Sequence, residues 1–295
     1  MSSPFYLIIR GEFVIVGKEP DGDSVRFIAD HSDFFQDLHR AHRIRLSSDG
    51  SVQLRFEGID APEVHYGTAA QPLGTDVRDQ LLAIMGFRNV RFESQRPNRV
   101  EHAQPDHIMG AILTQAAEAN GRPVSYLLLD AAARTIPEDE DWVRVDEALL
   151  RQTLNHQLLD RGLAYYTVYT STPASHRAEL RRAAAAARDA RRGIWAQDAT
   201  SDFQLQDQDS IGPGGQLILP KLFRRCTDYL KAVADGFRGN LGDWLVWVSE
   251  SRTRNENDRV VIRDSMETHL SELLDQRNDR IAFQADVLDI TFVEK

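Results

Sequence analysis

The sequence predicts an α+β fold, in which strands and helices occupy separate stretches of the chain. Two stretches near the start, residues 12–30 and 52–59, alternate apolar and polar side chains, which is typical of half-buried strands. Three later stretches repeat apolar residues at helical spacing: 75–85, 146–159 and 175–193. A polar segment rich in Gly and Pro then precedes a final stretch of mixed patterns.

The first two strands are predicted to form a hairpin. Phe13 and Ile15 alternate before a Pro-Asp-Gly-Asp turn, and Val25 and Phe27 alternate after it. Gly22 supplies the permissive backbone that such a turn requires.

A third strand is predicted over residues 52–59, and it stops where Pro62 removes a hydrogen-bond donor from the ladder. The residues between the hairpin and this strand, about 30–50, have no clean period, so they are expected to form an inserted loop with a helical turn. After the first helix, residues 89–93 resemble another short strand.

The domain organisation follows from the polar stretch. We expect a first domain over residues 1–200, a linker over 201–215 and a smaller α+β accessory domain over 216–295. In the accessory domain the predicted helices are 216–233 and 265–274, and the predicted strands are 244–248, 259–262 and 281–293.

Composition restricts the class of protein. The 295 residues carry a net charge of -10, which argues against general affinity for nucleic acid, so a phosphate-bearing partner must be bound locally. Six arginines between Arg177 and Arg192 form a local basic excess that is expected to be a solvated helix face.

Cys226 is the single cysteine, so no intramolecular disulfide is expected. With no secretory signal pattern and no apolar run long enough for a membrane, a cytoplasmic location is predicted.

Carboxylates gather where two predicted strands end. Asp21 and Asp23 lie in the hairpin turn, Asp60 and Glu63 follow the third strand, and Arg55 lies on that strand. Hard divalent cations such as Ca²⁺ take several oxygen ligands from carboxylates, carbonyls and water. Each of these short motifs is common when it occurs alone, but together they indicate a metal and phosphate site.

Five motifs occur in an order that resembles one family. They are DGDSV at 21–25, LRFEGIDAPE at 54–63, QPLG at 71–74, RGLAY at 161–165 and ARRGIW at 190–195. Over about residues 10–196 the chain resembles the thermonuclease, or staphylococcal-nuclease-like, family. The resemblance implies a five-stranded OB-type β-barrel with flanking helices, a fold that often binds nucleic acid.

The resemblance also implies roles for the site residues. It makes Asp23, Asp60 and the backbone carbonyl of Ala61 ligands of Ca²⁺, and Asp21 an acid just outside that set. It makes Glu63 the general base and Arg55 a guanidinium that grips the phosphate. The implied reaction is metal-assisted attack of water on a phosphodiester of single-stranded or loosely paired DNA or RNA.

The spacing of Arg55 and Asp60 requires a bend. Residues five apart on an unbroken strand face opposite sides of a sheet, so both can serve one site only if the strand is interrupted. Gly58 lies between them and is a suitable place for a bulge.

One expected feature is missing. The family has a second phosphate-binding arginine, and the corresponding position here falls at Met109 and Gly110. Arg96 and Arg99 precede this position and are interpreted as exposed loop charges, with a swing into the site as the alternative. Losing one such donor commonly lowers a rate by a factor of about 10² to 10³.

Two weaker candidates surround the substrate. His107 is interpreted as a surface histidine, with a phosphate contact or proton donor as the alternative. Tyr169 is the candidate for the family's nucleotide-stacking tyrosine, although Tyr165 and Tyr166 lie nearby and leave the register open.

Three hypotheses therefore compete. The first is a Ca²⁺-dependent nuclease, and the second is a catalytically weakened barrel that binds nucleic acid or a protein. The third is a module that a metal stabilises structurally. The accessory domain is expected to bind a protein partner or to mediate self-association.

Overall fold

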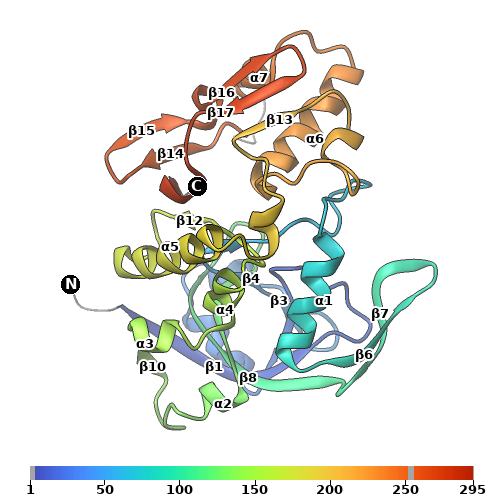
Figure 1. Ribbon diagram of the computed structural model, residues 1–295. Helices are drawn as coiled ribbons and strands as arrows, with labels where there is room; N and C mark the ends of the chain where they lie inside the picture. Colours follow the sequence, from blue (N-terminus) through green and yellow to red (C-terminus); the bar gives the residue numbers. More distant parts are fainter. Residues whose placement is uncertain (1–3, 252–255, 295) are drawn as a thin grey trace.

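The computed structural model describes residues 4–251 and 256–294, and it confirms the predicted α+β class (Figure 1). Its largest sheet has the strand order β3-β2-β1-β8-β9-β4, with β10 added beside β1. The strands are β1 (Phe5–Val14), β2 (Arg26–Ala29), β3 (Val52–Gln53), β4 (Arg55–Phe56), β8 (His107–Ala117), β9 (Pro123–Leu129) and β10 (Trp142–Arg144).

The sheet forms a nearly closed, OB-type barrel. Strands β3 and β4 are consecutive in sequence, yet they lie at the two ends of the strand order. The short segment 52–56 therefore joins the two ends of the sheet. The single strand predicted over 52–59 is wrong, because the structure divides it into short strands at 52–53, 55–56 and 59–60. Large aromatic side chains fill the interior, among them Phe13, Phe27 and Tyr126.

Helices cover the barrel. They are α1 (Gly74–Met85), α2 (Asp130–Ala133), α3 (Glu147–Leu150), α4 (Leu154–Asp160) and α5 (Ala174–Asp189), with short 3-10 turns η1 (Ser32–Asp37), η2 (Ala41–Arg43) and η3 (Gly193–Ala196). The single helix predicted over 146–159 is wrong, because it is two helices. The side chain of Asp146 caps α3, and that of Thr153 accepts a hydrogen bond from the His156 amide and starts α4.

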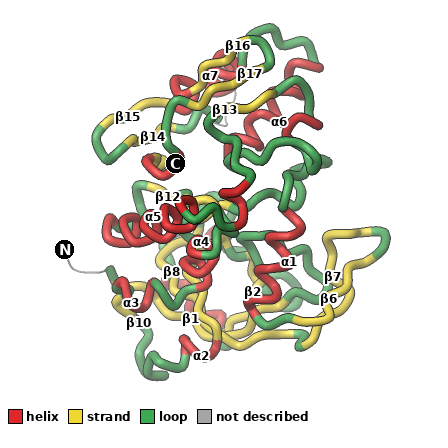
Figure 2. Tube along the Cα trace, in the orientation of Figure 1, coloured by secondary structure: helices red, strands yellow, loops and turns green. Residues whose placement is uncertain are grey.

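Two short pairings complete this part of the molecule. Strand β5 (Ile59–Asp60) pairs with β11 (Tyr165–Tyr166). Strands β6 (Arg88–Glu93) and β7 (Arg96–Gln104) form a hairpin that projects from the barrel (Figure 2). The strand predicted at 89–93 is confirmed as β6.

The C-terminal unit combines two helices with two small sheets. Helices are α6 (Pro220–Ala234) and α7 (Leu241–Ser251), and 3-10 turns are η4 (Asp209–Ile211), η5 (Leu270–Leu273) and η6 (Val287–Asp289). One sheet has the order β13 (Asp202–Gln204), β17 (Arg280–Phe283), β16 (Leu274–Arg277). The other has the order β12 (Val168–Tyr169), β18 (Ile290–Phe292), β14 (Arg259–Ile262), β15 (Met266–His269). Part of the stretch predicted as a linker, 201–215, thus supplies β13.

Several C-terminal predictions are wrong. Residues 244–248 lie in α7 rather than in a strand, because Trp244, Leu245 and Val248 are buried together at helical spacing. Residues 265–274 form β15 and η5 rather than a helix. The predicted strand 281–293 is interrupted by η6.

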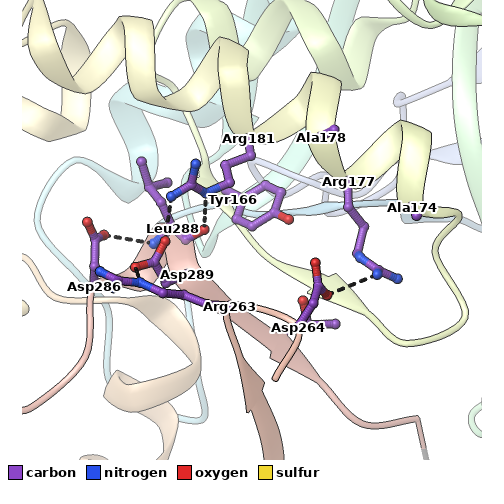
Figure 3. A pocket seen from close by; sticks show the side chains of 11 residues that line it. Tyr166, Ala174, Arg177, Ala178, Arg181, Arg263, Asp264, Asp286, Leu288 and Asp289 are labelled. Carbon is purple, nitrogen blue, oxygen red and sulfur yellow. Dashed lines mark hydrogen bonds and ion pairs between the residues drawn. The ribbon is translucent and has the colours of Figure 1, made fainter. Parts of the chain in front are cut away.

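The C-terminal unit is joined to the barrel by a sheet and by ion pairs. Strand β12, which belongs to the first part of the chain, pairs in parallel with β18, with Tyr169 opposite Phe292. Figure 3 shows Arg177 and Arg181 pointing from α5 toward Asp264 and Asp289. Arg177 lies 3.1 Å from Asp264. The predicted solvated face of α5 is therefore wrong for these arginines, which contact the C-terminal unit.

Among the described residues, no helix has both the length and the apolar character required to cross a membrane.

Candidate functional site

The site begins at the bend that the sequence predicts between β4 and β5. Gly58 has φ +78°, a left-handed backbone that favours glycine. An added Cβ would also lie 2.5 Å from a methyl carbon of Leu180. The bend allows Arg55 on β4 and Asp60 on β5 to serve one site, and Asp60 is buried there with 2% of its surface exposed.

The Asp-Gly-Asp turn is tied to the loop that carries Glu63. A carboxylate oxygen of Asp21 accepts hydrogen bonds from the amides of Gly22 at 2.7 Å and Val64 at 3.3 Å. At Gly22 an added Cβ would lie 2.7 Å from the side chain of Ala61. The two acidic motifs therefore lie directly against each other, as the sequence predicts.

The loop after Asp60 is held by the QPLG motif. The backbone N–H of Glu63 donates to the side-chain oxygen of Gln71 at 3.1 Å. In return, the backbone N–H of Gln71 donates to the backbone carbonyl of Glu63 at 3.0 Å. Gly74, at the start of α1, lies so close that an added Cβ would be 2.4 Å from the same carbonyl oxygen. These contacts fix the backbone of Glu63.

Burial and mutual repulsion perturb the carboxylates. Burial, and then the charges of Asp60, Asp21 and Glu63, raise the pKa of Asp23 to about 8. Burial raises the pKa of Glu63 to about 7, although Arg224 opposes the rise. Burial also raises the pKa of Asp21. Such a cluster of oxygen donors is suited to a positive charge.

The positive charge in this structure comes from Arg224, on helix α6 of the C-terminal unit. Its two terminal nitrogens lie 3.2 Å and 2.8 Å from the two carboxylate oxygens of Asp60. One of them also bonds to the Glu63 carboxylate. Sequence reasoning missed this residue, because it lies far along the chain in a helix with no recognisable motif.

Several oxygen donors of the type that Ca²⁺ requires lie in this region. Carboxylates and a backbone carbonyl, here that of Ala61, are the ligands that hard cations prefer. Within residues 4–251 and 256–294, however, no three acidic, His or Cys side chains converge closely enough to hold an ion. The oxygen donors are of the type that suits Ca²⁺, but in this structure they are not gathered around one point, and the guanidinium of Arg224 bonds to Asp60 and Glu63.

Arg55 lies beside Tyr169 and a second cation from α6. Its terminal nitrogen donates to the Tyr169 hydroxyl at 3.3 Å. The ammonium of Lys221 lies 5.2 Å from the centre of the Tyr169 ring and 4.3 Å from that of Phe292. Burial alone would raise the pKa of Tyr169, but the charges of Lys221 and Arg55 lower it. A cavity of about 420 Å³ is lined by Arg55, Tyr169 and Lys221 among others.

Arg55 and Arg224 act on each other electrostatically. Burial works to lower the pKa of Arg55, but the charges of Tyr169, Asp60 and Asp23 raise it overall. The charge of Arg224 acts in the lowering direction. Two guanidinium groups, one from the barrel and one from the C-terminal unit, therefore both feel the charge of Asp60.

The three tyrosines of this stretch differ in their surroundings, and which of them matches the family's stacking tyrosine stays a prediction. Tyr165 is fully buried and donates to Asp198 at 2.8 Å, and Tyr166 is buried on β11. Of the three, Tyr169 is the one that contacts Arg55.

The remaining candidates lie away from these contacts. His107 is exposed and lies 2.8 Å from Asp106 and 3.7 Å from Glu12. Met109, at the position of the missing arginine, is 43% exposed on β8. Arg96 and Arg99 both pair with Glu93 in the β6–β7 hairpin, at 2.7 Å and 2.9 Å.

Arg99 also lines a groove on the surface of the barrel. The groove has a volume of about 670 Å³ and also contains Asp21. The charged side chains of this groove are Lys18, Arg26, Arg99 and Arg122 with Glu19 and Asp21. Within its lining, four basic residues face two acidic ones, but Lys18, Arg99 and Arg122 pair with Asp49, Glu93 and Glu118 respectively, so the groove holds cations that are largely ion-paired.

Comparison with known proteins agrees with the resemblance drawn from the motifs. The sequence model of the family described as "Staphylococcal nuclease homologue" matches residues 53–197. The match includes Arg55, Asp60, Glu63 and Tyr169, whereas the turn that carries Asp21 and Asp23 lies before it. None of the curated proteins matches the chain.

Proposed function

Since residues 53–197 form a domain of the staphylococcal nuclease homologue family, we propose that this protein hydrolyses phosphodiester bonds of nucleic acid with the help of Ca²⁺. The observation that carries the proposal is the placement of Asp60, which acts electrostatically on Arg55 and shares the Arg224 guanidinium with Glu63. A metal-ligating carboxylate, a base and a phosphate-binding guanidinium are the parts that such a reaction needs.

Each side chain has a proposed task. Glu63 takes a proton from the attacking water, and a pKa near neutrality suits a general base. Arg55 binds non-bridging phosphate oxygens and is oriented by the Tyr169 hydroxyl. Asp23, Asp60 and the Ala61 carbonyl would hold Ca²⁺, which would polarise the phosphoryl oxygen when bound. Asp21 holds the turn against Val64 rather than ligating directly.

The substrate path is proposed along the basic groove. Its arginines and lysine can neutralise phosphates locally, and Asp21 connects the groove to the carboxylates. A single strand, or a loosely paired one, fits best because its backbone can bend into the site. His107, which pairs with Asp106, keeps the interpretation of a surface histidine.

The second candidate function is a binding module with weakened catalysis. It is favoured by Met109 at the position of the second arginine and by the engagement of Glu63 with Arg224. Such a module would bind single-stranded nucleic acid, or a protein partner, without cutting it.

One experiment separates the two functions. The protein is incubated at high concentration with single-stranded DNA or RNA and Ca²⁺, with EDTA as the metal-free control and Glu63→Gln as the base control. The nuclease predicts Ca²⁺-dependent cleavage that both controls abolish. Binding without cleavage, unchanged by Glu63→Gln, would establish the module instead.

Two finer points stay predictions. The cytoplasmic location is one, and fractionation of tagged protein would check it. The other is a protein partner, or a second copy of this chain, bound by the C-terminal unit, which sedimentation would detect.

A further inference from the structure

We propose that Arg224 supplies the second phosphate-binding guanidinium of the site, so that the C-terminal unit completes an active site that the barrel alone leaves incomplete. The inference rests on the proposed phosphodiesterase function. It assigns a substrate-contacting role to a residue outside the family domain, which ends at residue 197.

Helix α6 places two positively charged side chains at the site. It begins with Pro220 at its first turn, followed by Lys221 and Arg224. Residues three apart lie on the same helix face, so both side chains point in one direction. Lys221 reaches Tyr169, and Arg224 reaches Asp60 and Glu63. The adjacent Arg225 pairs with Asp258 at 3.0 Å, and Lys221 lies 3.6 Å from the same carboxylate.

The start of α6 is anchored to the barrel side of the site. The side chain of Gln71, which also holds Glu63, donates to the carbonyl of Ile218 at 2.7 Å. The Tyr66 hydroxyl donates to Asp228 on α6 at 2.6 Å. These bonds lie on both sides of Arg224 in the sequence, so the backbone position of Arg224 is fixed relative to Glu63.

Proximity to Glu63 gives Arg224 its role. A water that Glu63 deprotonates must lie within hydrogen-bond reach of that carboxylate, and the phosphorus it attacks must lie about 3 to 3.5 Å beyond. A guanidinium that already contacts Glu63 is therefore within side-chain reach of the phosphate oxygens. Its planar fork binds two such oxygens at once.

The contact with Asp60 keeps the Arg224 side chain at the site when no phosphate is bound. Without a bound ion the buried carboxylates need a counter-charge, and the guanidinium provides one. An ion held by Asp60 would compete for the two bonds from Arg224. The fork of Arg224 is then free to face a phosphate, where charge accumulates in the reaction.

A purely inhibitory role of Arg224, in which it only blocks the carboxylates, predicts a different result. If Arg224 only blocked the carboxylates, its removal would tighten Ca²⁺ binding and speed cleavage. If it binds phosphate, its removal weakens phosphate binding and slows cleavage whatever happens to the affinity for Ca²⁺.

The test compares the full-length protein with Arg224→Gln, Arg224→Lys and a control on the same helix, Lys231→Gln, whose side chain is exposed. Binding of a nucleoside 3′,5′-bisphosphate is measured by calorimetry with Ca²⁺ present, and Ca²⁺ binding is measured alone. We expect Arg224→Gln to weaken bisphosphate binding by about tenfold or more, since a hydrogen bond to a charged group is lost. Arg224→Lys keeps the charge without the fork and should lie between, and the control should match the unmodified protein.

Each outcome decides the inference. Unchanged bisphosphate affinity in Arg224→Gln, faster cleavage by it, or no bisphosphate binding by the unmodified protein would overturn it. Should Arg224→Gln fail to fold, Arg224→Lys, which retains the positive charge, gives the answer alone: bisphosphate affinity equal to that of the unmodified protein would overturn the inference. Bisphosphate binding that depends on Arg224 in a protein that never cleaves would reject the nuclease function but keep the phosphate contact. Cleavage that depends on Glu63 but not on Arg224 would keep the nuclease function but reject the phosphate contact of Arg224.

Discussion

Arg55 donates a hydrogen bond of 3.3 Å to the hydroxyl of Tyr169, and its guanidinium carbon lies 5.5 Å from the centre of that ring. Tyr169 in turn packs against Phe292 of the last strand, with ring centres 5.9 Å apart. Arg55, for which we propose phosphate binding, is thus supported by a side chain that the C-terminal unit holds in place.

Removing the Tyr169 hydroxyl should weaken phosphate binding with little effect on folding. Tyr169→Phe keeps the ring and its packing but deletes one hydrogen bond to Arg55, which is typically worth about 1 kcal/mol, or about fivefold in affinity. Titration with a nucleoside bisphosphate checks this. Tyr165→Phe, which loses the bond to Asp198 instead, should leave affinity unchanged, and an equal loss in both variants would contradict the assignment.

Substitution of Gly74 should displace Glu63. An added Cβ would meet the Glu63 carbonyl oxygen at 2.4 Å, so Gly74→Ala must shift this loop and should cost about 1 to 3 kcal/mol of stability. Misplacement of a catalytic group by about 1 Å can lower a rate by about 10². Cleavage assays and urea unfolding measure both effects. Gly214→Ala is the matched control, since nothing lies within 4 Å of the added carbon.

The ion pairs at α5 should stabilise the joined molecule. Asp289 is almost fully buried, lies 2.7 Å from Arg263 and also bonds to Arg181. Asp289→Asn leaves these arginines without a charge partner and should lower the free energy of unfolding by about 2 kcal/mol. In Asp275→Asn, which loses an exposed pair with Arg277, the change should stay within about 0.5 kcal/mol. Equal losses of the two variants in thermal and urea unfolding would show that the burial of Asp289 adds nothing to its ion pairs.

Ionised Glu179 should stabilise the folded protein, and this stabilisation should be lost at acidic pH. Burial works to raise its pKa, but hydrogen bonds from Arg151, Arg182 and His156 outweigh burial and lower the pKa from 4.5 to about 2. A folded-state pKa below the unfolded one stabilises the protein above pH 4.5, and this contribution is lost as the pH falls toward 2.

Comparison of Glu179→Gln with the unmodified protein isolates this effect from other groups. The variant should be less stable at neutral pH, and the difference between the two proteins should shrink over that acidic range. Urea unfolding at several pH values measures it. A difference that does not change with pH would show that Glu179 contributes by packing alone.

Local motifs made part of the site predictable. The bend at Gly58 follows from the spacing of Arg55 and Asp60, because strand geometry fixes which way neighbouring side chains point. The approach of the Asp21 turn to Glu63 follows from the order of the motifs along the chain. In each case the information lies within a few residues of the side chain concerned.

Contacts across long separations were not predictable. Arg224 meets Asp60 across 164 positions, and its neighbours in the sequence give no sign of that partner. The arginines of α5 look like a solvated face in the sequence, because only the folded C-terminal unit supplies Asp264 and Asp289. The helix at Trp244 and Trp247 was missed for another reason, since a short apolar run suits either a strand or a helix.

The parallel pairing of β12 with β18 has a practical consequence for anyone who shortens this chain. A fragment that ends near residue 200 would keep the whole family match but would leave the amide and carbonyl groups of Val168 and Tyr169 without their strand partner. An open sheet edge of this kind invites pairing between molecules. Such a fragment would be prone to aggregate, and its inactivity would then reflect a damaged edge rather than the chemistry of the barrel.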